Sequence, residues 1–344
     1  MSVGLVYHPI YLEHDTGLHC ETASRLTTTM SHLKNVGTLD KLIPIKPQAA
    51  TVEQIARVHS PSYISGIESF VKCGGGYLDG DTVASPASYE AAIYAAGGVI
   101  AAVDAVMSNK ATYAFALVRP PGHHAVRSAS MGFCIFNNIA IAARDAIAKY
   151  GLDRILIVDF DVHHGNGTQD AFYSESDVLY FSTHQYPFYP GSGGVDEIGS
   201  GEGEGYTVDV PMPGGCGDAE YIRAFEEVLV PVAKRYKPQL ILVSAGYDAH
   251  WADSISSMQV TTTGYAKMAA ILKDLADELC CSKLVFALEG GYNIEALAES
   301  VDATINVLLG TPKAYDTLGK PRRSWSPPDT EELFHSIKET HNLL

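Results

Sequence analysis

The segment from Asp159 to Gly167 carries side chains suited to hold a metal ion. It reads Asp-Phe-Asp-Val-His-His-Gly-Asn-Gly, and alternate residues of an extended chain point to one side, so Asp159, Asp161 and His163 converge. Two carboxylates and one imidazole suit zinc or another divalent transition metal. A lone acid and histidine would more commonly cap a helix at a strand end. Three converging groups followed by a Gly-Asn-Gly turn favour a metal site.

A site built on Asp161 and His163 alone would be weak, so a third ligand must come from a distant segment. Asp248, in Ser-Ala-Gly-Tyr-Asp, is the natural candidate because small residues let the backbone come close. The alternative is an ordinary loop acid or helix cap. Three protein ligands leave the fourth position of a tetrahedral zinc free for water or substrate, as in catalytic sites.

Two other segments offer groups that can transfer protons or donate hydrogen bonds. His123 and His124 are adjacent after two prolines, and imidazole suits general acid/base work, although buried histidines are also often structural. Beside a metal, one imidazole can take a proton from water, and Asp159 would orient it. Tyr292 follows a diglycine turn and would donate to an oxyanion if it faces the metal; otherwise it packs.

These residues follow short apolar runs that alternate with helical patterns, which predicts an α/β domain with a parallel sheet covered on both faces. Ligands bind such sheets beyond the carboxyl ends of the strands, where the candidate residues fall. Phe133 and Tyr189 are candidates for the walls of an apolar channel, although aromatic residues more often belong to a core. The predicted strands are 113–118, 154–159, 178–182, 239–244 and 283–288; the predicted helices are 88–107, 137–150, 219–236, 264–279 and 294–309; long loops cover 183–205 and 245–262.

Charge limits the partners. The 344 residues include 24 Lys and Arg against 40 Asp and Glu, a formal net charge of −16. Phosphate binding needs clustered basic residues, so no direct nucleic-acid partner is expected. An acidic field instead attracts metal ions, polyamines or basic protein segments. The hydrophobic fraction of 46% is ordinary for a globular protein, and the length is compatible with one large α/β domain.

The cysteines and the chain ends indicate the compartment. Six cysteines without a Cys-x-x-Cys pair are read as reduced thiols. The first residues lack the basic and apolar regions of a signal peptide, and no run of about 18 apolar residues is present. We therefore expect a soluble, cytoplasmic protein with no membrane partner. Residues 311–344 form an extension expected to pack on their own domain or on a second subunit, which leaves a homo-oligomer open.

Taken together, these motifs resemble those of the histone deacetylase family, including bacterial histone-deacetylase-like amidohydrolases and acetylpolyamine amidohydrolases. The resemblance implies one catalytic domain over residues 1–310, with a three-layer α/β/α, arginase-like fold around an eight-stranded, mostly parallel sheet. The matching segments occur in family order over nearly the whole chain and are 19–26, 79–82, 119–124, 132–134, 159–167, 246–248 and 289–293.

The resemblance also assigns roles. It implies one zinc ion on Asp161, His163 and Asp248, with His123 and His124 as the acid/base pair, Asp159 behind His123, and Tyr292 stabilising the tetrahedral intermediate. Phe133, Gly132 and Tyr189 would line an acyl-lysine tunnel, and Arg25 would lie near the acetate exit. Structural potassium ions would bind at an inner site made by Asp159, Asp161, His163, Ser182 and Thr183 and at an outer site made by Phe172, Glu175, Val178 and Tyr206.

Details of the motifs point to a subgroup. Asn166 stands where class I enzymes have an aspartate, and the motifs around it and Tyr292 look like the class II branch. Cys20 replaces the usual proline after His19. Arginases need a second metal and a further aspartate where this chain has His164 and Asn166, so a binuclear ureohydrolase is disfavoured.

The expected activity is zinc-dependent hydrolysis of the amide of N-acetylated lysine in peptides or proteins. An acetylpolyamine deacetylase is the alternative within the enzyme class, since the two substrates differ mainly in what stands at the tunnel mouth. A non-catalytic module that binds acylated ligands is the alternative outside that class. It would be expected to lack one of the ligands or donors that this chain retains.

Overall fold

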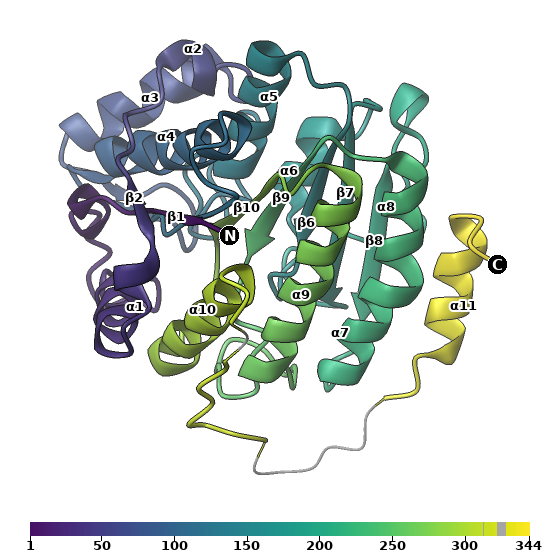
Figure 1. The fold of residues 1–344 in the computed structure, drawn as a ribbon. Helices are drawn as coiled ribbons and strands as arrows, with labels where there is room; N and C mark the ends of the chain where they lie inside the picture. The colour runs from purple at the N-terminus through teal and green to yellow at the C-terminus, as the bar shows by residue number, and fades with distance from the viewer. Residues whose placement is uncertain (312, 322–327) are drawn as a thin grey trace.

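The computed structural model describes residues 1–311, 313–321 and 328–344. Its centre is an eight-stranded sheet in the order β2-β1-β5-β10-β9-β6-β7-β8, and neighbouring strands are paired in parallel (Figure 1). The predicted α/β fold with an eight-stranded, mostly parallel sheet is thus confirmed. The strands are β1 (Val3–Val6), β2 (Ile43–Ile45), β5 (Tyr113–Ala116), β6 (Ile155–Asp159), β7 (Val178–Gln185), β8 (Thr207–Met212), β9 (Leu240–Ala245) and β10 (Leu284–Leu288); β3 (Gly76–Tyr77) and β4 (Val83–Ala84) form a separate hairpin.

Helices cover both faces of the sheet. The long α4 packs on α5 and on three central strands, while α1, α10, α9 and α7 pack one against the next on the other face (Figure 1). The helices are α1 (Ser24–Asn35), α2 (Val52–Ile55), α3 (Pro61–Lys72), α4 (Ser88–Met107), α5 (Asn138–Tyr150), α6 (Asn166–Phe172), α7 (Asp218–Ala224), α8 (Val230–Tyr236), α9 (Thr262–Leu279), α10 (Ile294–Leu308) and α11 (Glu331–Thr340).

The central strands are buried along their whole length. Every residue of β5, β6, β9 and β10 is buried, since both faces of the sheet lie under helices. Two asparagines then begin the helices that come after the loops at the carboxyl edge: Asn137 accepts from the amide of Ala140, and Asn293 accepts from that of Ala296. These caps fix where each loop ends and its helix starts.

The predicted elements differ from the observed ones at their ends. All five predicted strands are present, but β7 continues to Gln185, so the predicted loop 183–205 begins too early. The predicted helix 219–236 contains a π-helical stretch, Phe225–Leu229, between α7 and α8. Each of the six cysteines, all in described parts of the chain, is a free thiol, as predicted.

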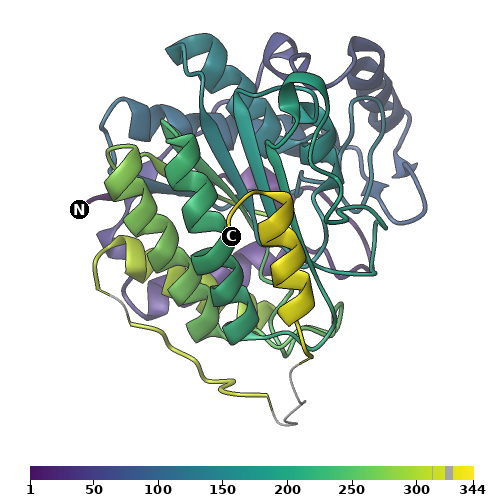
Figure 2. The ribbon, with the colours of Figure 1, turned by 90° about the vertical axis from the view of Figure 1, so that its right-hand side faces the viewer.

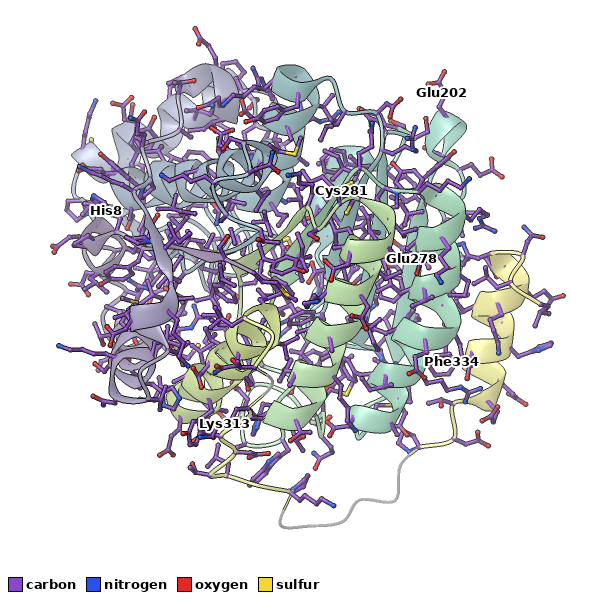
Figure 3. The ribbon with its side chains drawn as sticks, in the orientation of Figure 1. His8, Glu202, Glu278, Cys281, Lys313 and Phe334 are labelled. Atoms are coloured by element: carbon purple, nitrogen blue, oxygen red, sulfur yellow. The ribbon has the colours of Figure 1, made fainter. Side chains whose placement is uncertain are left out.

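The C-terminal helix α11 lies against the β8 edge of the sheet (Figure 2). Its Phe334 and Ile337 are fully buried, and Phe334 faces the body of the domain in Figure 3. The Arg223 guanidinium stacks 4.4 Å from the Phe334 ring centroid and pairs with Glu331 at 2.7 Å. Apolar burial and an ion pair therefore attach this helix to α7 and β8.

Among the described residues, α4 alone is long and apolar enough to cross a membrane. In this structure 67% of its most apolar stretch is buried. It contacts β1, β5 and β10 along its length, so it serves here as a core helix.

Candidate metal and catalytic site

Four neighbouring strands bring the candidate residues together. β5, β10, β9 and β6 lie side by side in the sheet, and parallel strands end at the same edge. Groups that are far apart in sequence therefore meet at one place. The segments after these strands carry, in sheet order, His123 and His124, then Tyr292, then Asp248, then Asp161 and His163.

The three candidate metal ligands form a compact buried cluster. One ligand atom from each of Asp161, His163 and Asp248 lies within 4.8 Å of the others. His163 Nδ1 is 3.1 Å from Asp161 Oδ1 and 3.4 Å from Asp248 Oδ2. Although Asp248 is fully buried, its Oδ2 has no hydrogen-bond partner among the described residues. Such an oxygen is costly to bury, and a divalent cation would satisfy it, so the donor set fits zinc.

Backbone amides hold the opposite sides of these carboxylates. The amide of Val162 donates to Asp248 Oδ1 at 2.9 Å, and that of Gly290 donates to Asp161 Oδ2 at 2.8 Å. A Cβ at Gly290 would lie 2.2 Å from Asp248 Oδ2, so only glycine allows this approach. Burial and the neighbouring Asp161 carboxylate raise the pKa of Asp248. Two crowded anions in a buried cluster again indicate a place for a cation.

The tandem histidines differ in their partners. His123 Nδ1 lies 3.0 Å from Asp159 Oδ2, and His124 Nδ1 lies 2.8 Å from Asn166 Oδ1. Burial alone would lower the pKa of His123, but the Asp159 and Asp161 carboxylates outweigh it and raise this pKa to about 10. Burial and the charges of His123 and His163 hold the pKa of His124 well below its usual value. The surroundings of the two imidazoles therefore favour the charged form of His123 and the neutral form of His124.

Tyr292 is only partly buried and lies between an arginine and an aromatic wall. The Arg25 guanidinium carbon is 5.0 Å from the Tyr292 ring centroid, and the Phe133 ring stands perpendicular to Tyr292 at 5.7 Å. Arg25 itself is fully buried and donates to the carbonyl of Gly291 at 2.7 Å. The arginine predicted near the acetate exit therefore supports the loop that carries Tyr292.

Aromatic rings surround the approach to the histidines. The Tyr189 ring is 5.2 Å from His124, and the Phe133 ring is 4.6 Å from His19. Phe188, which the sequence motifs did not single out, stacks on the candidate ligand His163 at 5.3 Å. Its position next to Tyr189, a predicted channel residue, was the available signal.

A second contact that was missed holds Tyr292 in place. The carboxylate of Asp253 accepts from the amides of Tyr292 at 2.6 Å and Asn293 at 2.8 Å. Asp253 is buried and lies five residues after Asp248, so the loops after β9 and β10 are tied together. No spacing in the sequence distinguishes it from an ordinary loop acid.

The residues predicted for potassium occupy two places. In the inner set, Ser182 is in register with Asp159 across β6 and β7, and the buried hydroxyl of Thr183 has no partner among the described residues. The outer set lies at the start of β7 and β8, where Tyr180 donates its amide to the carbonyl of Tyr206 at 2.9 Å and Glu175 pairs with Arg144. The inner set therefore lies beside the candidate metal cluster, whereas the outer set lies at the other end of β7.

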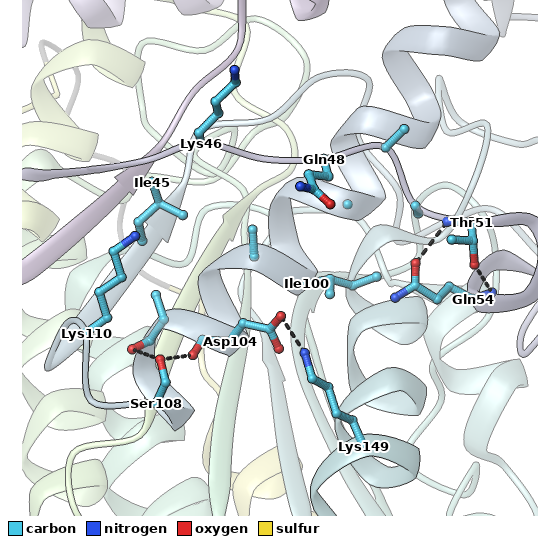
Figure 4. Close-up of a pocket in the computed structure, with 15 residues that line it drawn as sticks. Ile45, Lys46, Gln48, Thr51, Gln54, Ile100, Asp104, Ser108, Lys110 and Lys149 are labelled. Atoms are coloured by element: carbon cyan, nitrogen blue, oxygen red, sulfur yellow. Dashed lines mark hydrogen bonds and ion pairs between the residues drawn. The ribbon is translucent and has the colours of Figure 1, made fainter.

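A hollow of about 500 Å³ elsewhere on the molecule lies beside β2 and α4 (Figure 4). Of the described residues that line it, Asp104 alone carries a carboxylate, and Lys149 pairs with that carboxylate at 2.7 Å. Tyr150 donates to the other oxygen of Asp104 at 2.8 Å. This hollow therefore lacks the free acids and imidazoles of the site at the carboxyl edge.

Comparisons with known proteins show the family to which the chain belongs. A family model for the histone deacetylase domain matches residues 19–308. The chain is 45% identical to histone deacetylase 14, chloroplastic, of Arabidopsis thaliana, over 86% of this chain and 73% of that protein, and 40% identical to human polyamine deacetylase HDAC10, over 91% and 49%. The crystal structure of the HDA15 HD domain superposes with a TM-score of 0.88 at 36% identity, covering 99% of this chain and 94% of the other. The chain belongs to the histone deacetylase family.

Proposed function

We propose that this deacetylase is zinc-dependent and that it hydrolyses the amide of N-acetylated lysine in peptides or proteins. The observation that carries the proposal is the cluster of Asp161, His163 and Asp248, with its unpartnered buried oxygen, beside the tandem histidines. Zinc bound by these three residues would polarise the amide carbonyl and acidify a water molecule.

The residues of the chain supply the proton transfers. His124, neutral because its pKa is depressed, accepts a proton from the attacking water. The pair of His123 and His124 returns a proton to the leaving amine, while Asp159 keeps His123 oriented and charged. Tyr292 donates its hydroxyl hydrogen to the oxygen that becomes negative in the tetrahedral intermediate.

The approach to the site suits an apolar alkyl chain. The Tyr189 ring contacts His124 edge-on and the Phe133 ring contacts Tyr292. The amide of Phe133 donates to the Thr82 hydroxyl at 3.0 Å. Asp79 and Asp81, on the same segment as Thr82, add carboxylates near this rim. The rings suit the methylene chain of lysine, and the acids attract a basic peptide.

Acetylated polyamine is the second candidate substrate. It is favoured by the likeness to a relative named as a polyamine deacetylase and by the net charge of −16. A polyamine and a lysine-rich peptide are both cationic, so the rim acids suit either. The two substrates must be separated by measurement.

A competition assay tests the proposal. Zinc-loaded enzyme is incubated with an acetyl-lysine peptide and N-acetylspermidine together, and the kcat/KM values for the two substrates are compared. We expect a higher value for the peptide; a higher value for the polyamine would reassign the substrate. Turnover of neither substrate, with zinc confirmed in the protein, would contradict the proposed activity.

Metal dependence is tested separately. Asp248→Ala is expected to lose zinc and activity together, since it removes one of three ligands. Asp302→Ala, a buried aspartate on α10 that accepts from the Thr38 hydroxyl, serves as the control and should retain zinc. Zinc content measured by mass spectrometry decides; a fully loaded Asp248→Ala protein would remove Asp248 from the ligand set.

We also propose a structural potassium ion at the inner set of Asp159, Asp161, His163, Ser182 and Thr183. The unpartnered hydroxyl of Thr183 and the position of this set beside the metal cluster support it. Replacement of potassium by tetramethylammonium is expected to lower the melting temperature, whereas replacement of chloride by acetate should not.

A further inference from the structure

A fully buried carboxylate, Glu289, lies outside the roles assigned so far. It is the first residue after β10 and has no exposed surface. Its Oε2 accepts from the amides of Gly122 at 2.6 Å and His123 at 3.2 Å, and its Oε1 accepts from the Ser244 hydroxyl at 3.0 Å. Every oxygen of this side chain therefore has a partner.

Glu289 and its partners belong to three neighbouring strands. Gly122 and His123 lie in the segment after β5, Ser244 lies in β9, and Glu289 itself begins the loop that carries Tyr292. Since β10 lies between β5 and β9 in the sheet, this one side chain bridges the strand on each side of it.

The main chain around Glu289 is also fixed. Its amide donates to the carbonyl of Ala245 at 3.0 Å, and the buried guanidinium of Arg25 donates to the carbonyls of Glu289 and Gly291. The loop between β10 and Tyr292 is thus held from one side by Arg25 and from the other by contacts of Glu289. Because the backbone is fixed here, the length of the side chain determines how far the carboxylate extends.

We propose that Glu289 is a positioning residue that holds the His123 and His124 segment at a fixed distance from the Tyr292 loop. This inference rests on the proposed function, in which the histidines move protons and Tyr292 donates to the oxyanion. Productive chemistry requires these groups in one geometry, and a misplacement of about 1 Å can cost about 100-fold in rate. Glu289 acts through these residues and does not itself touch the substrate.

The contacts require the length of the side chain and not its charge. Burial raises the pKa of Glu289 to about 7, so the neutral form is accessible near neutral pH. A glutamine at this position can turn its carbonyl oxygen to the two amides and its NH₂ to Ser244, whose hydroxyl then accepts. An aspartate keeps the charge but is one methylene too short to reach both neighbours.

Three variants separate these properties. Glu289→Gln should keep kcat within about threefold, whereas Glu289→Asp and Glu289→Ala should lower it by about 10- to 100-fold with KM within about threefold and zinc content unchanged. Asp302→Ala is the matched control for loss of a buried acid outside the site, and should lower stability without changing kcat. Hydrogen exchange should rise in residues 119–126 and 289–293 in the Asp and Ala variants only.

The kcat values of Glu289→Gln and Glu289→Asp, compared with each other, decide whether length or charge is required. A glutamine variant slower than the aspartate variant would show that charge is required and would overturn the positioning role. So would an alanine variant with normal kcat. If Glu289→Ala does not fold, the order of Gln and Asp still decides.

Failure of the proposed function is recognised independently. The ratios are measured on whichever acetylated substrate the unaltered enzyme turns over, so a polyamine preference leaves them valid. If the unaltered enzyme hydrolyses neither substrate, the proposed function fails, while hydrogen exchange still tests the bridge. Unchanged exchange in both segments of the aspartate variant would overturn it.

Discussion

His124 Nδ1 lies 2.8 Å from the side-chain oxygen of Asn166, a neutral acceptor. The neighbouring His123 has the Asp159 carboxylate in the equivalent place, and this difference helps to shift the pKa values of the two imidazoles in opposite directions. Burial and two nearby histidines hold the pKa of His124 well below its usual value, which favours the neutral form that can act as a base.

Asn166→Asp would place a negative charge on the acceptor and raise the pKa of His124. A base acts only when deprotonated, so activity is lost as pH falls through its pKa. The acidic limb of the kcat/KM profile is therefore expected to move to higher pH by about one to two units. Profiles of the two enzymes, extended to a pH low enough to reach the acidic limb of each, test this, and an unmoved limb would mean that His124 is not the base.

Tyr292→Phe tests the oxyanion donor. The ring, its contact with Phe133 and its place over Arg25 remain, so only the hydroxyl is lost. If that hydroxyl donates in the transition state, kcat falls by about 10²–10³ while KM and zinc content change little. A nearly normal kcat would leave the oxyanion to the metal and the histidines.

Gly132→Ala tests the close approach of the Gly132 backbone to His124. A Cβ at Gly132 would lie 2.3 Å from His124 Cδ2, at a φ of +53°. We expect at least a tenfold loss of kcat because the imidazole must move. Gly151→Ala is the control: φ is +66° but nothing lies within 4 Å of the added Cβ, so stability should fall and kcat should not. Equal losses of kcat in both variants would refute the contact as the cause.

Glu21→Gln tests an acid-sensitive cluster behind the site. Burial opposes ionisation of Glu21, but Arg119 at 2.7 Å and Arg25 at 3.0 Å outweigh it and lower its pKa to about 2. Because the pKa of Glu21 is lower in the folded protein than its ordinary value near 4.5, ionised Glu21 adds to the free energy of unfolding, here by about 3 kcal/mol. This contribution is complete above pH 4.5 and is lost as pH falls toward 2. Denaturant unfolding at pH 7, 5 and 3 should show a smaller acid loss in the variant; an unchanged pH dependence would contradict this.

The sequence predicted the interior of the sheet better than its margins. The five strands found by pattern include β6, in which every residue is apolar except the terminal Asp159. The missed β1, β2 and β8 are short or interrupted: Pro44 lies in β2, and Asp209 and Pro211 lie in β8. These strands form because they pair with neighbouring strands, and not because their own residues have a high β-propensity. A local sequence pattern therefore cannot find them. The resemblance to the family supplied the count of eight strands.

For the site, residue type and order located the groups, but not their partners. Motif spacing placed Asp161, His163 and Asp248 together because the segments after parallel strands all begin at one edge of the sheet. Asp253 and Glu289 act through backbone amides of other loops. Any acidic residue at the right distance can accept hydrogen bonds from backbone amides, so only the three-dimensional structure reveals these two.

The position of β10 has a consequence for synthesis of the protein. Strands β2, β1 and β5 form one part of the sheet and β9, β6, β7 and β8 the other, and β10 alone pairs with both. A ribosome-bound chain that ends before residue 284 therefore lacks the strand that joins these two parts, and any part that has already folded exposes an apolar edge that β10 covers in the complete protein. The last strand to emerge closes the sheet and, four residues later, delivers Tyr292. Until β10 is in place, the nascent chain can bind chaperones or aggregate at this edge. The site that needs Tyr292 can form only after the same strand has been added.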